Sequence, residues 1–166
     1  MKKIQNEVKE LNKAIDKIGL INDSDWKATL NERKVKELEF HDRDRMNQGS
    51  NNQVNDVQEG DTFEKFYGNK KYYNIIKRSN SYVQDWIAKE AKNNIILDYA
   101  CGNGTNARHA AKSGAALSIG FDISGISVKN ATKFAKDENI KNIRFFQADA
   151  ENTKIPNNSI DRIICS

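Results

Sequence analysis

The spacing of hydrophobic residues changes along the chain, and the change separates two kinds of structure. In residues 3–20 hydrophobic residues recur every three or four positions, which predicts a helix with one apolar face. Its apolar positions are Ile4, Val8, Leu11, Ile15 and Ile18. We expect this helix to pack against its own domain, with self-association or a partner helix as the alternative.

A second helix is predicted to begin at Ser24 or Asp25, either of which can cap it, and to continue toward residue 42. Its apolar positions are Trp26, Leu30, Val35 and Leu38. Residues 46–61 then lack large apolar groups and are rich in Asn, Gln, Gly and Asp, which indicates a linker or a mobile loop.

Residues 63–78 combine aromatic and basic side chains. Such a mixture can stack bases and hold phosphates, but a helix that packs its rings on the core is the commoner explanation. A further helix is predicted for residues 82–91.

From Asn94 onward, short apolar runs alternate with helical patterns. The predicted strands are 95–97, 116–121, 143–148 and 159–165, and the predicted helices between them are 106–112 and 124–136. This alternation predicts an α/β fold with a parallel sheet of about four strands and helices on both faces. We therefore divide the chain into a helical N-terminal segment with a polar linker, residues 1–60, and a sheet-containing domain, residues 61–166.

A glycine turn follows the first strand. Asp98 comes after Ile95–Leu97, Gly102 and Gly104 occupy alternate positions, and a helix begins directly afterwards. Glycine lets the backbone turn sharply and lets a ligand approach it, and the helix start beyond offers unpaired N–H groups. Strand, glycine turn and helix together are typical of the first βαβ unit of nucleotide-binding domains.

Aspartates fall at the ends of three successive predicted strands, namely Asp98, Asp122 and Asp149. The carboxyl ends of parallel strands meet at one edge of a sheet, and ligands bind there. We expect the three acids to contact different parts of one extended ligand. Asp122 can accept hydrogen bonds from both hydroxyls of a ribose, and Asp149 with Ala150 can pair with the edge of an adenine.

Four stretches of the sequence resemble, in order and spacing, the motifs of the class I S-adenosylmethionine-dependent methyltransferases. They are residues 96–105, 120–124, 146–151 and 159–166. The resemblance implies a Rossmann-like fold, methyl transfer and S-adenosyl-L-methionine as cofactor. The family normally has seven strands, so we expect this chain to be a piece of a longer protein.

The resemblance also implies which residues bind the cofactor. They are Asp98, Ala100, Cys101, Gly102, Gly104, Asp122, Ile123, Asp149, Ala150 and Ser166. The glycines would line the methionine moiety, with Asp98 near its ammonium group and Ser166 near the same end. Ile123 would pack on the adenine. The family usually has glycine where this chain has Ala100.

No catalytic base can be assigned, and we expect His41 and His109 to be structural or solvated. The methyl acceptor is expected to be a small molecule or a lipid, because the sequence has no strong basic stripe. The basic aromatic residues 63–78 leave RNA as a minority option. Neither cysteine, Cys101 or Cys165, suits a disulfide framework or a metal site, so we expect a cytoplasmic protein.

Two other functions fit parts of the sequence. The residues Gly102–Ala107 fit the looser glycine pattern of NAD-dependent oxidoreductases, although Asp98 would then lie unfavourably close to a pyrophosphate. A non-catalytic cofactor-binding or interaction module is the second alternative.

Overall fold

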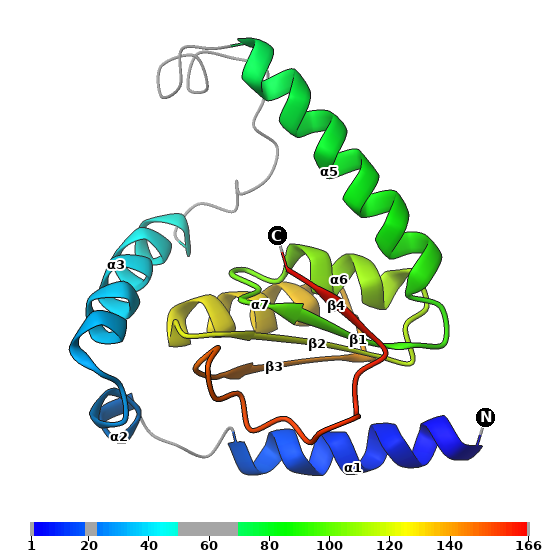
Figure 1. The fold of residues 1–166 in the computed structure, drawn as a ribbon, viewed down its shortest axis with the longest axis horizontal. Helices are drawn as coiled ribbons and strands as arrows, with labels where there is room; N and C mark the ends of the chain where they lie inside the picture. Colours follow the sequence, from blue (N-terminus) through cyan, green and yellow to red (C-terminus); the bar gives the residue numbers. More distant parts are fainter. Residues whose placement is uncertain (1, 19–22, 50–69, 166) are drawn as a thin grey trace.

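The structure, a computed structural model, describes residues 2–18, 23–49 and 70–165 (Figure 1). Its elements follow one another as α1 (Lys2–Ile18), α2 (Asp23–Ala28), α3 (Glu32–Gly49), α5 (Lys70–Glu90), β1 (Ile95–Tyr99), α6 (Thr105–Lys112), β2 (Leu117–Asp122), α7 (Gly125–Asp137), β3 (Ile143–Gln147) and β4 (Arg162–Ile164). None of these helices is long and apolar enough to cross a membrane.

The described strands form one parallel sheet in the order β3-β2-β1-β4. Helix α6 connects β1 to β2, and α7 connects β2 to β3. Such crossover helices must pack on the sheet because parallel neighbours cannot be joined by a tight turn. The predicted α/β fold, with a Rossmann-like parallel sheet between helices, is therefore confirmed.

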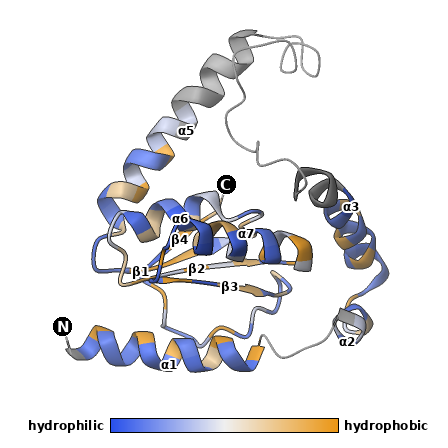
Figure 2. Cartoon of the chain, turned by 180° about the vertical axis from the view of Figure 1, so that it is seen from behind, coloured by the Kyte–Doolittle hydropathy of each residue, from blue (hydrophilic) through white to orange (hydrophobic). Residues whose placement is uncertain are grey.

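Helix α1 covers one face of the sheet (Figure 1). Its side chains Leu11 and Ile15 are each 2% exposed. They pack among the inward residues of the strands, which are Ile95, Leu97, Leu117, Ile119, Phe121, Phe146 and Ala148. Figure 2 shows α1 as mainly hydrophilic with separate hydrophobic positions, as expected of a helix that buries one side. The structure thus agrees with the expectation that this helix packs on its own domain.

Helices α5, α6 and α7 occupy the other face. Ile87 and Ala91, at the end of α5, pack with Ala110 of α6 and with Ile96 and Ile164 of the sheet. Alanines fill much of the contact between α6, α7 and β3, so the helices approach the sheet closely. This arrangement places the start of α6 directly beyond the end of β1.

The second predicted helix is in fact two helices, α2 and α3, so that prediction is wrong in its extent. The hydroxyl of Thr29 donates to the carbonyl of Trp26 and helps to end α2. The side chain of Asn31 accepts a hydrogen bond from the Lys34 N–H and caps the new helix α3. Both residues satisfy helix ends locally, which allows the chain to turn between them.

Three other predicted boundaries also require correction. Helix α3 continues to Gly49, so the predicted linker cannot begin at residue 46. Helix α5 begins at Lys70, well before the predicted residue 82. The fourth strand is only Arg162–Ile164; just before it, the Asp161 carboxylate accepts from the Ile95 N–H and the Asp161 N–H donates to the Ile95 carbonyl. The remaining linker residues, 50–61, and aromatic residues 63–69 lie outside the described residues.

Candidate functional site

The turn after β1 has left-handed backbone conformations at every second residue. The φ angles are 56° at Ala100, 52° at Gly102 and 75° at Gly104. The Cys101 N–H donates to the carbonyl of Phe121 at 2.8 Å, which holds the turn against β2. Glycine tolerates this conformation freely, whereas Ala100 adopts it at a steric cost.

The ring of Phe145 packs against this turn from β3. A Cβ atom built on Gly104 or on Gly120 would lie 2.6 Å from a carbon of that ring. Side chains essentially never approach so closely, so the two glycines are required for Phe145 to fit. The glycine turn, β2 and β3 are therefore packed together at this end of the sheet.

Asp98 is buried at the end of β1, with 2% of its surface exposed. Its Oδ2 atom accepts a hydrogen bond from the Ala107 N–H in the first turn of α6, at 3.0 Å. The pKa of Asp98 is raised to about 7, chiefly by burial; the bond from the Ala107 N–H lowers it and the negative charge of Asp122 adds a smaller rise. Asp98 therefore anchors the glycine turn to α6 and is easily protonated.

Asp122 ends β2 and connects two loops. Its Oδ2 accepts from the Gly102 N–H at 2.8 Å, and its Oδ1 accepts from the Ser124 N–H at 2.9 Å. Ser124 is the N-cap of α7, where its hydroxyl oxygen accepts from the Ser127 N–H. A carboxylate oxygen can accept a second hydrogen bond, so these contacts leave Asp122 able to bind ligand hydroxyls.

Asp149 follows β3, and both of its oxygens are engaged. Oδ1 accepts from the Glu151 N–H at 3.0 Å, and Oδ2 accepts from the Lys34 ammonium at 2.6 Å. Burial acts to raise the pKa of Asp149, but the bonds from Lys34 and Glu151 outweigh it and hold the pKa below its usual range. Next to it, the carbonyl of Ala150 accepts from the Tyr99 hydroxyl at 2.5 Å.

The structure brings most of the predicted residues to one edge of the sheet. The end of β1 and the glycine turn that follows it hold Asp98, Ala100, Cys101, Gly102 and Gly104, and Asp122 of β2 bonds to this turn through the Gly102 N–H. The Ala148 N–H donates to the Asp122 carbonyl at 3.0 Å, which brings the start of the Asp149–Ala150 loop beside β2. Ile123 is held there by its carbonyl, which accepts from the Gln147 side chain at 2.8 Å. Ser166 lies outside the described residues.

Several residues that shape this edge could not be found from the sequence. Lys34 reaches Asp149 across 115 positions of sequence, and Asp42 reaches Ser124 across 82. No periodicity connects residues so far apart. The capping role of Ser124, by contrast, follows from its place just before a helical pattern. We expected both histidines to be structural or solvated. His109 has a structural contact, because its ring nitrogen Nε2 forms a hydrogen bond with the Gln84 carbonyl of α5.

The side-chain oxygen of Asn103, inside the glycine turn, is buried without a hydrogen-bond partner among the described residues. An orphaned buried acceptor is unfavourable unless a ligand or water completes it. No basic side chain of the described residues forms an ion pair with Asp98 or Asp122. These acceptor oxygens therefore suit a ligand with positive charge, as in the sulfonium and ammonium groups of S-adenosylmethionine.

The sheet order, the glycine turn and the acids at the carboxyl edge define a Rossmann-like α/β domain of the nucleotide-binding class. Within that class, residues 96–166 match the family model of a methyltransferase domain. This match confirms the resemblance predicted from the motifs. No curated protein sequence matches the chain.

Solved structures that are similar to the chain include the YcgJ protein from Bacillus subtilis, with 28% identity over 50% of this chain and 36% of that chain, at a TM-score of 0.46. The PRMT1 enzyme–prozyme complex of Trypanosoma brucei has 28% identity over 45% of this chain and 23% of that chain, at a TM-score of 0.40. An rRNA methylase from Streptococcus thermophilus has 19% identity over 40% of this chain and 37% of that chain, at a TM-score of 0.37. The chain thus spans less than two fifths of the length of each.

Proposed function

We propose that residues 94–166 bind S-adenosyl-L-methionine, and that the protein transfers its methyl group to a small-molecule or lipid acceptor. When bound, the cofactor supplies an electrophilic methyl group on its sulfonium. The match of residues 96–166 to a methyltransferase domain supports this proposal. The choice of a small-molecule or lipid acceptor rests on the absence of a strong basic stripe in the sequence.

The residues at the carboxyl edge have distinct tasks in this proposal. The turn of Ala100, Cys101, Gly102 and Gly104 lines the methionine moiety, with Asp98 near its ammonium group. Asp122 accepts from the ribose hydroxyls while it keeps its bonds to the Gly102 and Ser124 amides. Transfer then depends mainly on alignment of the acceptor, the methyl carbon and the sulfur, with a base only where the acceptor must lose a proton.

At the other end of the ligand, Asp149 accepts from the adenine amino group and the Ala150 N–H faces a ring nitrogen. Ile123 packs on the adenine, and the bond from Gln147 to its carbonyl fixes the loop. Ser166 would lie near the methionine end of the cofactor. A cytoplasmic location remains our expectation from the two free cysteines.

The observation that carries the proposal is the buried acid pair at the glycine turn. Burial and the charge of Asp122 keep the pKa of Asp98 near 7, so the free site disfavours further negative charge. A cationic cofactor relieves this repulsion, whereas the pyrophosphate of a nicotinamide cofactor would increase it. The site therefore favours S-adenosylmethionine over NAD.

Isothermal titration with S-adenosylhomocysteine tests binding. We expect the wild type to bind and Asp122→Asn to bind at least about tenfold more weakly, because hydrogen bonds to a charged group contribute about 1.5–3 kcal/mol. Asp137→Asn is the matched control, since Asp137 is an exposed aspartate at the end of α7. Thermal unfolding of each variant verifies folding. Absence of binding, or equal binding by wild type and Asp122→Asn, would refute the proposal.

Transfer of a radiolabelled methyl group to small molecules, lipids and RNA then separates an enzyme from a cofactor-binding module. The protein should be tested with all of the chain that its gene encodes. Transfer to a small molecule or lipid is expected. Binding of S-adenosylhomocysteine without transfer to any acceptor would favour the module instead.

A further inference from the structure

Helix α3 is bonded to the two loops that follow β2 and β3. The Lys34 ammonium donates to Asp149 at 2.6 Å and to Glu151 at 2.7 Å. Two turns further along α3, Asp42 accepts a hydrogen bond from the Ser124 hydroxyl at 2.5 Å. These contacts join a helix near the N-terminus to both loops that, in the proposed function, hold the adenosine.

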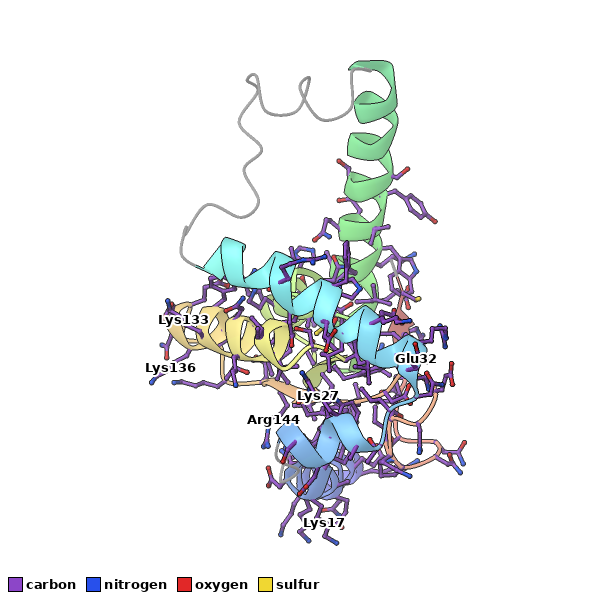
Figure 3. The ribbon with its side chains drawn as sticks, turned by 90° about the vertical axis from the view of Figure 1, so that its left-hand side faces the viewer. Lys17, Lys27, Glu32, Lys133, Lys136 and Arg144 are labelled. Atoms are coloured by element: carbon purple, nitrogen blue, oxygen red, sulfur yellow. The ribbon has the colours of Figure 1, made fainter. Side chains whose placement is uncertain are left out.

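The spacing along α3 suits this bridging role. Lys34, Leu38 and Asp42 are four residues apart, so their side chains lie on one face of the helix. The Lys34 and Asp42 positions are about 12 Å apart along its axis, since each residue of a helix rises about 1.5 Å. Leu38, between them, is 1% exposed. Figures 1 and 3 show α3 beside α7, on the side where β2 and β3 end.

The pairing at Lys34 is well shielded from water. Its side chain is 10% exposed and that of Asp149 is 18% exposed, whereas Glu151 is 64% exposed. The hydrogen bonds to Asp149 and Glu151 raise the pKa of Lys34, so the ammonium stays charged. Each oxygen of Asp149 therefore already accepts one hydrogen bond, as at Asp122, but at Asp149 the donor to Oδ2 is a charged ammonium.

We propose that α3 is a latch on the cofactor site, in which Lys34 and the adenine amino group compete for Asp149. This inference rests on the proposed function, which gives Asp149 to the adenine. When the cofactor binds, Lys34 leaves Asp149 and keeps its second partner, Glu151. That exchange keeps the ammonium paired, because it already contacts both carboxylates, while the Asp149 carboxylate exchanges an ion pair for a hydrogen bond from a neutral amino group. Breaking the bond between Lys34 and Asp149 uses part of the binding energy, so the apparent affinity for the cofactor is lower than it would be without that bond.

The test compares dissociation constants for S-adenosylhomocysteine by isothermal titration. Lys34→Met removes the competing charge and keeps the length of the side chain, so we expect binding to tighten about two- to fivefold, the range of a single ion pair. Lys36→Met is the matched control, because Lys36 pairs with Glu32 on the exposed side of the same helix. We expect its affinity to equal that of the wild type.

A second variant should act in the opposite direction. Glu151→Gln removes the alternative partner, so Lys34 remains with Asp149 and binding should weaken. Glu151 is mostly exposed, and this variant is expected to fold normally. Hydrogen exchange provides a separate readout: the amides of α3 should exchange faster in the wild type saturated with S-adenosylhomocysteine than in the free protein.

The outcomes separate the latch from the proposed function. If no variant binds S-adenosylhomocysteine, both fail. If the wild type binds and Lys34→Met binds equally or more weakly, or if α3 becomes more protected on binding, the latch is refuted while cofactor binding stands. Tighter binding by Lys34→Met alone, with faster exchange in α3 of the liganded wild type, supports it.

Discussion

The buried carboxyl group of Asp98 should make the protein less stable as the pH rises. Its pKa is raised from 3.8 to about 7 in the folded protein, chiefly by burial. The folded state therefore holds a proton that the unfolded chain has already released between about pH 4 and pH 7. Stability from this group is fully present below about pH 4 and is lost as the pH rises through 7. Asp98→Asn, which is neutral at every pH, should remove this dependence.

The size of the effect follows from the shift. A rise of about three pKa units, at about 1.36 kcal/mol per unit, corresponds to about 4 kcal/mol above pH 7. Roughly 2–3 kcal/mol of it falls between pH 5 and pH 8, because the unfolded chain already titrates partly below pH 5. An asparagine oxygen can still accept the hydrogen bond from the Ala107 N–H, so the variant keeps that contact.

Urea unfolding at pH 5 and at pH 8 measures the effect. The free energy of unfolding of Asp98→Asn, minus that of the wild type, should be larger at pH 8 by roughly 2–3 kcal/mol. All groups common to both proteins cancel in this difference. Asp137→Asn, an exposed control, should show no such change. A difference that is the same at both pH values would refute the reasoning that a buried carboxylate is destabilising here.

Two further substitutions test the local structure. Ala100→Gly should raise the free energy of unfolding by up to about 1 kcal/mol, because alanine at a φ of 56° is strained and glycine is not. The control Ala88→Gly, at an exposed position of α5, should lower the free energy of unfolding. If Ala100→Gly also lowered it, the strain at Ala100 would be contradicted. Leu11→Ala should destabilise by about 2–5 kcal/mol in urea unfolding because Leu11 is buried between α1 and the sheet. Lys9→Ala on the exposed side of α1 is its control, and similar small losses from both would show that α1 does not cover the sheet.

Features that depend on neighbouring residues could be predicted from the sequence. The alternation of apolar runs and helical patterns predicted the parallel sheet, since each strand and helix has its own periodicity. The glycine turn could be located because Gly102 and Gly104 supply conformations that few other residues adopt. The placement of Asp98 and Asp122 at the same edge of the sheet followed from their positions near the ends of neighbouring parallel strands.

Features that depend on distant residues could not be predicted. The break between α2 and α3 rests on Asn31, whose capping role was missed because the apolar spacing continues from Trp26 to Leu38. The position of Lys34 over Asp149 depends on how α3 packs on α7, which no pattern within either helix specifies. Ala100 was recognised as unusual only by comparison with the family, and the structure gives the physical reason in its φ angle.

The cost of Asp98 bears on the function of the turn. Asparagine at this position could accept from the Ala107 N–H equally well and would avoid the loss of stability above pH 7. Folding alone therefore does not explain a carboxyl group there, and strained or destabilised groups are typical of functional sites. A cationic ligand would lower the pKa of Asp98 and recover that energy on binding. The acid pair of Asp98 and Asp122, rather than the glycines, is thus the feature on which the proposal of a sulfonium cofactor rests.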